Sequence, residues 1–101
     1  MYKMFVVTYS VKVTRNERLT KAISDKLSEH HTWWHYIAPT WLVVSDKNAD
    51  EIARPLLDRV REAKGRLLVM EVRPKEHQGL LPKEAWKWIN EWATWLENQK
   101  S

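Results

Sequence analysis

Apolar residues recur along the first third of the chain with two different periods, which predict a strand followed by a helix. Residues 2–13 contain the continuous apolar run FVV and then alternate polar and apolar side chains, as strands do. A continuous run is typical of a strand that is covered on both faces. Residues 16–31 carry Leu19, Ile23 and Leu27 at four-residue intervals, which predicts a helix with one apolar stripe.

The next segment, TWWHYIAPTWLVVSD at residues 32–46, contains three of the seven tryptophans. Two short runs rich in aromatic and β-branched residues flank the turn signal Ala38-Pro39-Thr40, and this pattern predicts a β-hairpin. Isolated hairpins are marginally stable in water. We therefore expect the rest of the chain to pack against this hairpin.

Residues 48–64 again show a helical apolar stripe, but Pro55 interrupts it. A proline inside a helix removes a backbone donor and crowds the preceding turn, so it predicts either a kink or a later helix start. Gly65 follows where a left-handed C′ residue is expected. Residues 66–73 contain the continuous apolar run LLVM and predict the fourth strand.

Residues 82–99 predict a C-terminal helix whose first position is Pro82. On a helical wheel, Ala85, Ile89 and Leu96 gather with four tryptophans on one half-circle, and polar residues fill the other half. A half-circle is wider than the stripe of about 100° that suffices to dock a helix on a core. The tryptophans are therefore interface candidates: Trp86, Trp88, Trp92 and Trp95.

The succession strand, helix, strand, strand, helix, strand predicts an α+β protein with a ferredoxin-like βαββαβ antiparallel sheet and an added Trp-rich helix. At 101 residues the chain is expected to form a single domain, residues 1–101. Right-handed crossovers place the first two helices on one face of the sheet. The apolar strands require a cover for the other face, and this is the Trp-rich helix, a second protomer, or both.

The amino-acid composition excludes some kinds of chemistry and favours others. The chain has no cysteine, which excludes disulfides and thiol catalysis. It has no apolar run long enough to span a membrane and no signal-peptide pattern, so we expect a cytoplasmic protein. The formal net charge is +4, with acidic residues interspersed among the basic ones. This surplus favours an anionic partner, although a mixed solvated surface explains it equally well.

Three motifs carry a resemblance to a known family. They are VTYSV at residues 7–11, WWHY at 33–36 followed by TWLV at 40–43, and LPKEAW at 81–86. Together they make the chain resemble SinR-family small proteins, whose fold is like that of the small CRISPR-adaptation subunit and the VapD-type ribonucleases. The label implies no helix-turn-helix here. The resemblance implies the fold described above and a homodimer.

The resemblance also bears on catalysis. The related proteins carry an Asp after the strand-one Tyr, and in the nucleases it is thought to hold a metal. This chain has Ser10 at that position, a neutral residue and a poor Mg²⁺ ligand. The departure argues against a metal-dependent nuclease, and we expect no catalytic residues, no metal and no cofactor. His31 and His35 have metal-like spacing only on a helix, whereas His35 is predicted on a strand.

Aromatic and basic residues mingle near the expected strand ends. Bases stack on aromatic rings, and phosphates bind Arg and Lys. An equally simple interpretation is that the tryptophans are core and interface. The candidate ligand-binding residues are Tyr9, Ser10, Lys12, Arg15, Trp33, His35, Arg73, Lys75 and His77.

The leading hypothesis is a non-enzymatic homo-oligomer that binds a small anionic nucleotide, with single-stranded nucleic acid as a further possible ligand. Long nucleic acid usually requires a denser basic stripe. Two alternatives stay open at this point. One is a remnant nuclease of the related families, and the other is a protein-binding module that docks through its Trp-rich helix.

Overall fold

The computed structural model describes residues 1–10 and 17–99, which form one four-stranded antiparallel sheet and three helices. The strand order in the sheet is β2-β3-β1-β4. This confirms the expected α+β class. The elements are β1 (Lys3–Ser10), α1 (Glu17–Leu27), β2 (Thr32–Ile37), β3 (Thr40–Ser45), α2 (Ala49–Glu62), β4 (Arg66–Val72) and α3 (Lys83–Asn98).

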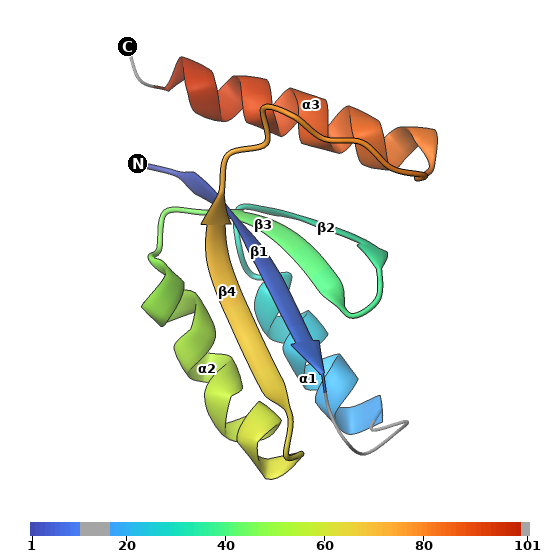
Figure 1. The fold of residues 1–101 in the computed structure, drawn as a ribbon. Coiled ribbons are helices and arrows are strands. Elements are labelled where there is room, and N and C mark those ends of the chain that lie inside the picture. The colour runs from blue at the N-terminus through green and yellow to red at the C-terminus, as the bar shows by residue number, and fades with distance from the viewer. Residues whose placement is uncertain (11–16, 100–101) are drawn as a thin grey trace.

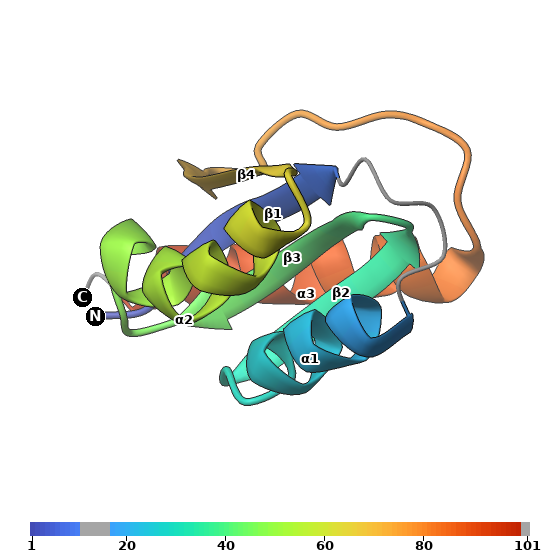
Figure 2. The same cartoon turned by 90° about the horizontal axis from the view of Figure 1, so that it is seen from below.

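The sheet separates the helices into two layers. Helices α1 and α2 cover one face, which we call the inner face, and α3 lies across the opposite, outer face (Figures 1 and 2). The strand register shows which side chains point each way, because directly paired residues of antiparallel strands share a face. Val7 pairs with Trp41 and Val69 on the inner face. The alternate residues of each strand point to the outer face. Val6, for example, pairs there with Leu42 and Met70.

The main core lies between the inner face and the two helices α1 and α2. The three stripe residues of α1 predicted from sequence, Leu19, Ile23 and Leu27, are all buried there. They meet apolar residues of α2 and of the two central strands. The other members of this core are Phe5, Val7, Tyr9, Trp41, Val43, Ile52, Leu56, Val60 and Ala63.

Helix α2 begins at Ala49 and continues through Pro55, so the expectation of a later helix start is wrong. A capping box explains the early start, since Asn48 Oδ1 accepts the Glu51 N–H at 2.8 Å and Glu51 Oε1 accepts the Asn48 N–H at 3.1 Å. With the first turn held in this way and Ile52 buried, the proline does not prevent the helix from forming.

The C-terminus of α2 corrects a second expectation. The left-handed residue is Lys64, with φ 53°, rather than Gly65. The Gly65 N–H donates to the Val60 carbonyl at 2.9 Å and the Lys64 N–H donates to the Arg61 carbonyl at 3.0 Å. These two bonds form a Schellman motif, in which the glycine occupies the position after the left-handed residue.

Other boundaries differ from the expected ones by a few residues. Helix α1 ends at Leu27 rather than at residue 31, and there the Ser28 hydroxyl donates to the Ser24 carbonyl at 2.7 Å. Such a local side-chain bond competes with continued helix. Strand β1 is described to Ser10, and the predicted continuation to residue 13 lies outside the described residues. The predicted turn lies between β2 and β3, where the Ala38–Pro39 peptide bond is cis.

Candidate functional site

Helix α3 is fixed at both ends to the outer face of the sheet. Near its start, the indole of Trp34 donates to the Ala85 carbonyl at 3.2 Å, and the Trp88 indole donates to Thr32 Oγ1 at 3.1 Å. At its other end, Gln99 Nε2 donates to the Tyr2 carbonyl at 2.6 Å, and Gln99 Oε1 accepts the Tyr2 N–H at 3.2 Å. The helix therefore spans from β2 to the beginning of β1.

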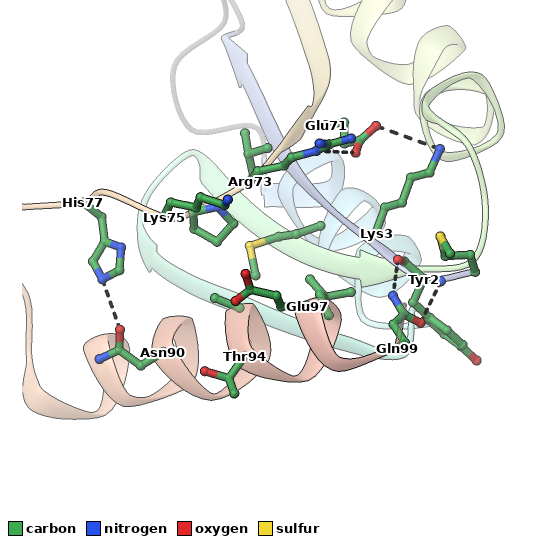
Figure 3. Close-up of a pocket in the computed structure, with 16 residues that line it drawn as sticks. Tyr2, Lys3, Glu71, Arg73, Lys75, His77, Asn90, Thr94, Glu97 and Gln99 are labelled. Carbon is green, nitrogen blue, oxygen red and sulfur yellow. Dashed lines mark hydrogen bonds and ion pairs between the residues drawn. The ribbon is translucent and has the colours of Figure 1, made fainter. Parts of the chain in front are cut away.

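A pocket of about 450 Å³ lies between α3 and the end of the sheet where β1 begins and β4 ends (Figure 3). We call it the α3 pocket. Its volume is within the usual range for sites that hold small molecules. Its lining residues are Met1, Tyr2, Lys3, Met4, Glu71, Val72, Arg73, Pro74, Lys75, His77, Asn90, Ala93, Thr94, Leu96, Glu97 and Gln99.

Cationic side chains from separate parts of the chain meet at this pocket. Glu71 lies between two of them, 3.9 Å from Lys3 Nζ and 3.7 Å from Arg73 Nε (Figure 3). These ion pairs are long and solvent-exposed, so each contributes little to stability. Among the described residues, Lys75 and Glu97 make no ion pair. The pocket thus presents three cationic side chains and two carboxylates.

His77 is held on the loop that leads to α3. Its Nε2 donates to Asn90 Oδ1 at 3.2 Å, because the amide oxygen can only accept. Its ring stacks on the indole of Trp86, with ring centroids 5.5 Å apart and planes 20° from parallel. The other ring nitrogen, Nδ1, makes no hydrogen bond to any described residue. A second, shallow hollow shares Lys75 and His77 and is widely open to solvent.

The structure brings some of the predicted ligand-binding residues together and separates others. Arg73, Lys75 and His77 all line the α3 pocket. Tyr9 belongs to the inner core, on the opposite face of the sheet. Ser10 is exposed at the far end of β1, where it pairs with Arg66. The predicted residues Lys12 and Arg15 lie outside the described residues.

Trp33 and His35 also lie away from the pocket, on the inner side of β2. The His35 ring stacks on Trp41, with centroids 4.1 Å apart and planes within 14°, and Trp33 contacts the same indole at 5.4 Å. His35 Nε2 and Trp41 Nε1 are buried and find no hydrogen-bond partner within residues 1–10 and 17–99. Burial lowers the pKa of His35 from its ordinary value, because desolvation disfavours the charged imidazolium.

His30 forms a separate polar contact at the end of the hairpin. Its Nδ1 lies 3.1 Å from the hydroxyl of buried Ser45, which also accepts the Lys47 N–H at 3.1 Å. Burial lowers the pKa of His30, and the positive charge of Lys47 lowers it further. This arrangement stabilises the turn that leads into α2 and does not reach the α3 pocket.

The four tryptophans of α3, which are the predicted interface residues, divide into two groups. Trp86 and Trp88 are half-buried and pack with Leu42 and Leu81 against the outer face. Trp92 and Trp95 join a cluster of aromatic rings with Tyr2 and His31, in which centroids lie 4.8–5.5 Å apart. Trp95 remains 39% exposed. The helix thus uses its tryptophans to dock on its own sheet, at least in part.

Sequence reasoning missed most of the polar and charged residues that line the pocket: Tyr2, Lys3, Glu71, Asn90, Thr94, Glu97 and Gln99. Lys3 lies in the first strand, and Asn90 and Glu97 were assigned to the solvated half of the last helix. The hydrogen bonds between Gln99 and Tyr2 join the end of α3 to the start of the chain. No periodic pattern marks such a contact, since the two partners are 97 residues apart.

Within residues 1–10 and 17–99, no group of three or more His, Asp or Glu side chains is arranged to hold a metal ion. None of the helices in the same ranges is long and apolar enough to cross a membrane.

No protein-family model, no curated protein and no solved structure matches this chain.

Proposed function

We propose that this protein is a non-enzymatic, homo-oligomeric binding protein for a small anionic ligand of the nucleotide type, held in the α3 pocket. The observation that supports this most directly is the convergence of Lys3, Arg73 and Lys75 on a pocket of about 450 Å³. The ferredoxin-like identity of the fold and the relationship to SinR-family proteins are parts of the same proposal.

In this proposal a phosphate group binds at the Arg73 end of the pocket. Glu71 holds Arg73 and Lys3 only through long, exposed contacts of 3.7 and 3.9 Å. A phosphate oxygen forms shorter charge-assisted hydrogen bonds with the same groups and competes with the carboxylate for them. Lys75 has no competing carboxylate among the described residues, so it is free to join the phosphate.

The base of such a ligand lies toward His77. The imidazole is already stacked on Trp86 and fixed by Asn90, so a planar ring can pack on it at little conformational cost. Its unpaired Nδ1 adds one hydrogen-bonding group. Two carboxylates in the lining, Glu71 and Glu97, limit the number of negative charges that the pocket accepts, which favours one or two phosphates over a long polyanion.

The test is thermal unfolding of the whole chain with a panel of nucleoside mono- and diphosphates, cyclic nucleotides and the matching nucleosides. A specific ligand at a hundredfold excess over its Kd adds about 2.7 kcal/mol of stability. For a domain of this size that corresponds to a rise in Tm of about 10–20 °C. The nucleosides, which lack phosphate, are expected to have little effect.

Two variants locate the binding site. The double variant R73A/K75A is expected to weaken binding at least tenfold, since each hydrogen bond to a charged group contributes about 1.5–3 kcal/mol. Arg59→Ala is the matched control, because it removes an exposed positive charge from α2, on the opposite face of the sheet. The proposal fails if no nucleotide raises the Tm, or if R73A/K75A is stabilised as much as the wild type.

A further inference from the structure

Strand β4 is an exposed sheet edge whose sequence is that of a covered strand. It pairs with β1 on one side, and the order β2-β3-β1-β4 leaves its other side without a neighbour in the described structure. Its centre is the apolar run LLVM, yet none of its residues is fully buried. Leu68 is 46% exposed and Met70 is 50% exposed. Both belong to the part of the outer face that α3 does not cover.

The two edges of the sheet differ in a way that matters for association. Proteins usually blunt an edge strand with a bulge, a proline or a charge in its middle. At the other edge, β2 has a register irregularity between Trp34 and Ile37 and leads into Pro39. The middle of β4 has none of these devices. An apolar, regular edge of this kind is a site for pairing with another strand.

The most fitting partner strand is β4 of a second copy. Antiparallel pairing centred on Val69 sets Leu68 of each copy opposite Met70 of the other, so that the two half-exposed apolar side chains cover each other. The same register sets Arg66 opposite Val72. No two like charges face each other within β4 in this register. A twofold interface must be self-complementary in this manner.

We infer that two copies of this chain join their β4 edges in an antiparallel pair centred on Val69, and that Arg66 of each copy completes the α3 pocket of the other. Val72 lines the pocket and pairs with Met4 on the outer face, so the residue opposite it lies on the same face. In its own protomer, Arg66 is exposed beside Ser10, six residues from the pocket end of β4.

This arrangement adds a guanidinium to the Arg73 and Lys75 end of the pocket and couples ligand binding to dimer formation. The contribution of Arg66 rests on the proposed function, whereas the dimer does not. A ligand that contacts both copies binds the dimer more tightly than the monomer. Mass action therefore requires that the same ligand raise the dimer fraction at a given protein concentration.

The dimer is tested by light scattering on the full chain. We expect the mass of a dimer for the wild type and of a monomer for Leu68→Lys, because a charge in the middle of the edge blocks strand pairing. Leu80→Lys is the matched control, since Leu80 is 97% exposed and lies outside β4. A cooperative thermal transition and a far-ultraviolet circular dichroism spectrum like that of Leu80→Lys verify that Leu68→Lys folds, although loss of the dimer is expected to lower its Tm. A monomeric wild type, or a dimeric Leu68→Lys, overturns the inference.

The register is tested by oxidation of Val69→Cys, for which the natural absence of cysteine provides a clean background. Residues opposite each other across an antiparallel pair have Cα atoms about 4.5–5.5 Å apart, within the range of a disulfide. We expect a covalent dimer on a non-reducing gel, and none for Leu80→Cys. A dimer by light scattering that does not cross-link at position 69 overturns the register.

The shared pocket is tested by Arg66→Ala with the nucleotide that stabilises the wild type most. We expect a dimer whose affinity is about tenfold lower, and a similarly reduced affinity for monomeric Leu68→Lys. Binding by Arg66→Ala that equals wild-type binding overturns the shared pocket. If no nucleotide stabilises the wild type, the proposed function fails, while light scattering still decides the dimer.

Discussion

The two faces of the sheet are covered to very different extents. The inner face is sealed by α1 and α2, and residues such as Val7, Ile23 and Leu56 have no measurable exposure. The outer face is covered by one helix that reaches from β2 to the start of β1, while Leu68 and Met70 on β4 stay half-exposed. The difference indicates that the inner face stabilises the fold, whereas the outer face supplies the pocket and the free edge.

The same contrast appears in the polar contacts. On the outer face the indoles of Trp34 and Trp88 both find acceptors, so the docking of α3 is specified by hydrogen bonds as well as by packing. On the inner side of the hairpin, Trp41 Nε1 and His35 Nε2 are buried without a hydrogen-bond partner in the part of the chain that the structure describes. Unpaired buried groups reduce stability, and here the surrounding apolar core compensates for them.

The largest expected effect is in the inner core. Leu56→Ala is expected to lower the free energy of unfolding by about 2–5 kcal/mol, because a fully buried leucine leaves a cavity that the helices cannot close. Urea denaturation followed by circular dichroism measures this change. The adjacent residue provides the control: Leu57 is 37% exposed, and Leu57→Ala is expected to cost less than about 1 kcal/mol. Equal losses in the two variants would contradict the assignment of the core.

A smaller effect is expected where α3 docks. Trp34→Phe removes the indole that donates to the Ala85 carbonyl and reduces the volume of a side chain that is 4% exposed. The expected loss is about 1–3 kcal/mol, and hydrogen exchange in α3 should accelerate more than exchange in α1.

The neighbouring tryptophan is the matched control for this variant. Trp33 points to the other side of β2 and is 45% exposed, so Trp33→Phe is expected to change stability by less than about 1 kcal/mol and to leave exchange in α3 unchanged. If Trp33→Phe accelerates exchange in α3 as much as Trp34→Phe does, the docking of the helix through Trp34 is wrong.

The smallest effect concerns the unpaired imidazole on the inner side. His35→Phe keeps a flat ring against Trp41 and removes the buried, unpartnered Nε2. We expect stability at pH 7 to stay the same or to increase by about 1 kcal/mol. A clear loss of stability would show that His35 makes a favourable polar interaction.

The pH dependence of the same variant sharpens the test. Burial lowers the pKa of His35 below its ordinary value of 6.5 in the folded protein, so the unfolded chain binds more protons as the pH falls through that value. The free energy of unfolding of the wild type therefore decreases on acidification from pH 7 to pH 5.5. His30, whose pKa is also lowered, contributes in the same direction. His35→Phe should show a shallower decrease, measured by urea titrations at each pH, and equal slopes would contradict this account.

Much of the fold was predictable because it follows from local patterns. The four-residue spacing of Leu19, Ile23 and Leu27 sufficed to identify the buried stripe of α1, and the turn signal at Pro39 separated β2 from β3. The start of α2 was less predictable. Pro55 disfavours a helix locally, but the capping box at Asn48 and burial of Ile52 outweigh it.

The site was only partly predictable. Arg73, Lys75 and His77 follow one another in the chain, so a single prediction covered all three, and they do line one pocket. The stacking partners proposed with them, Tyr9 and Trp33, lie on the other face. Alternation along a strand predicts that two faces differ, but it does not say which face a distant loop will approach.

The sequence by itself determined the succession of strands and helices, the apolar stripes of the helices and the absence of thiol chemistry, because each depends on residues that are close in the chain or on composition alone. The tertiary structure decided the rest. It buried Trp34 and exposed its neighbour Trp33, brought Lys3 to Arg73, and left the apolar strand β4 uncovered at the edge. Burial and charge proximity depend on how distant segments pack, and local patterns do not specify that packing.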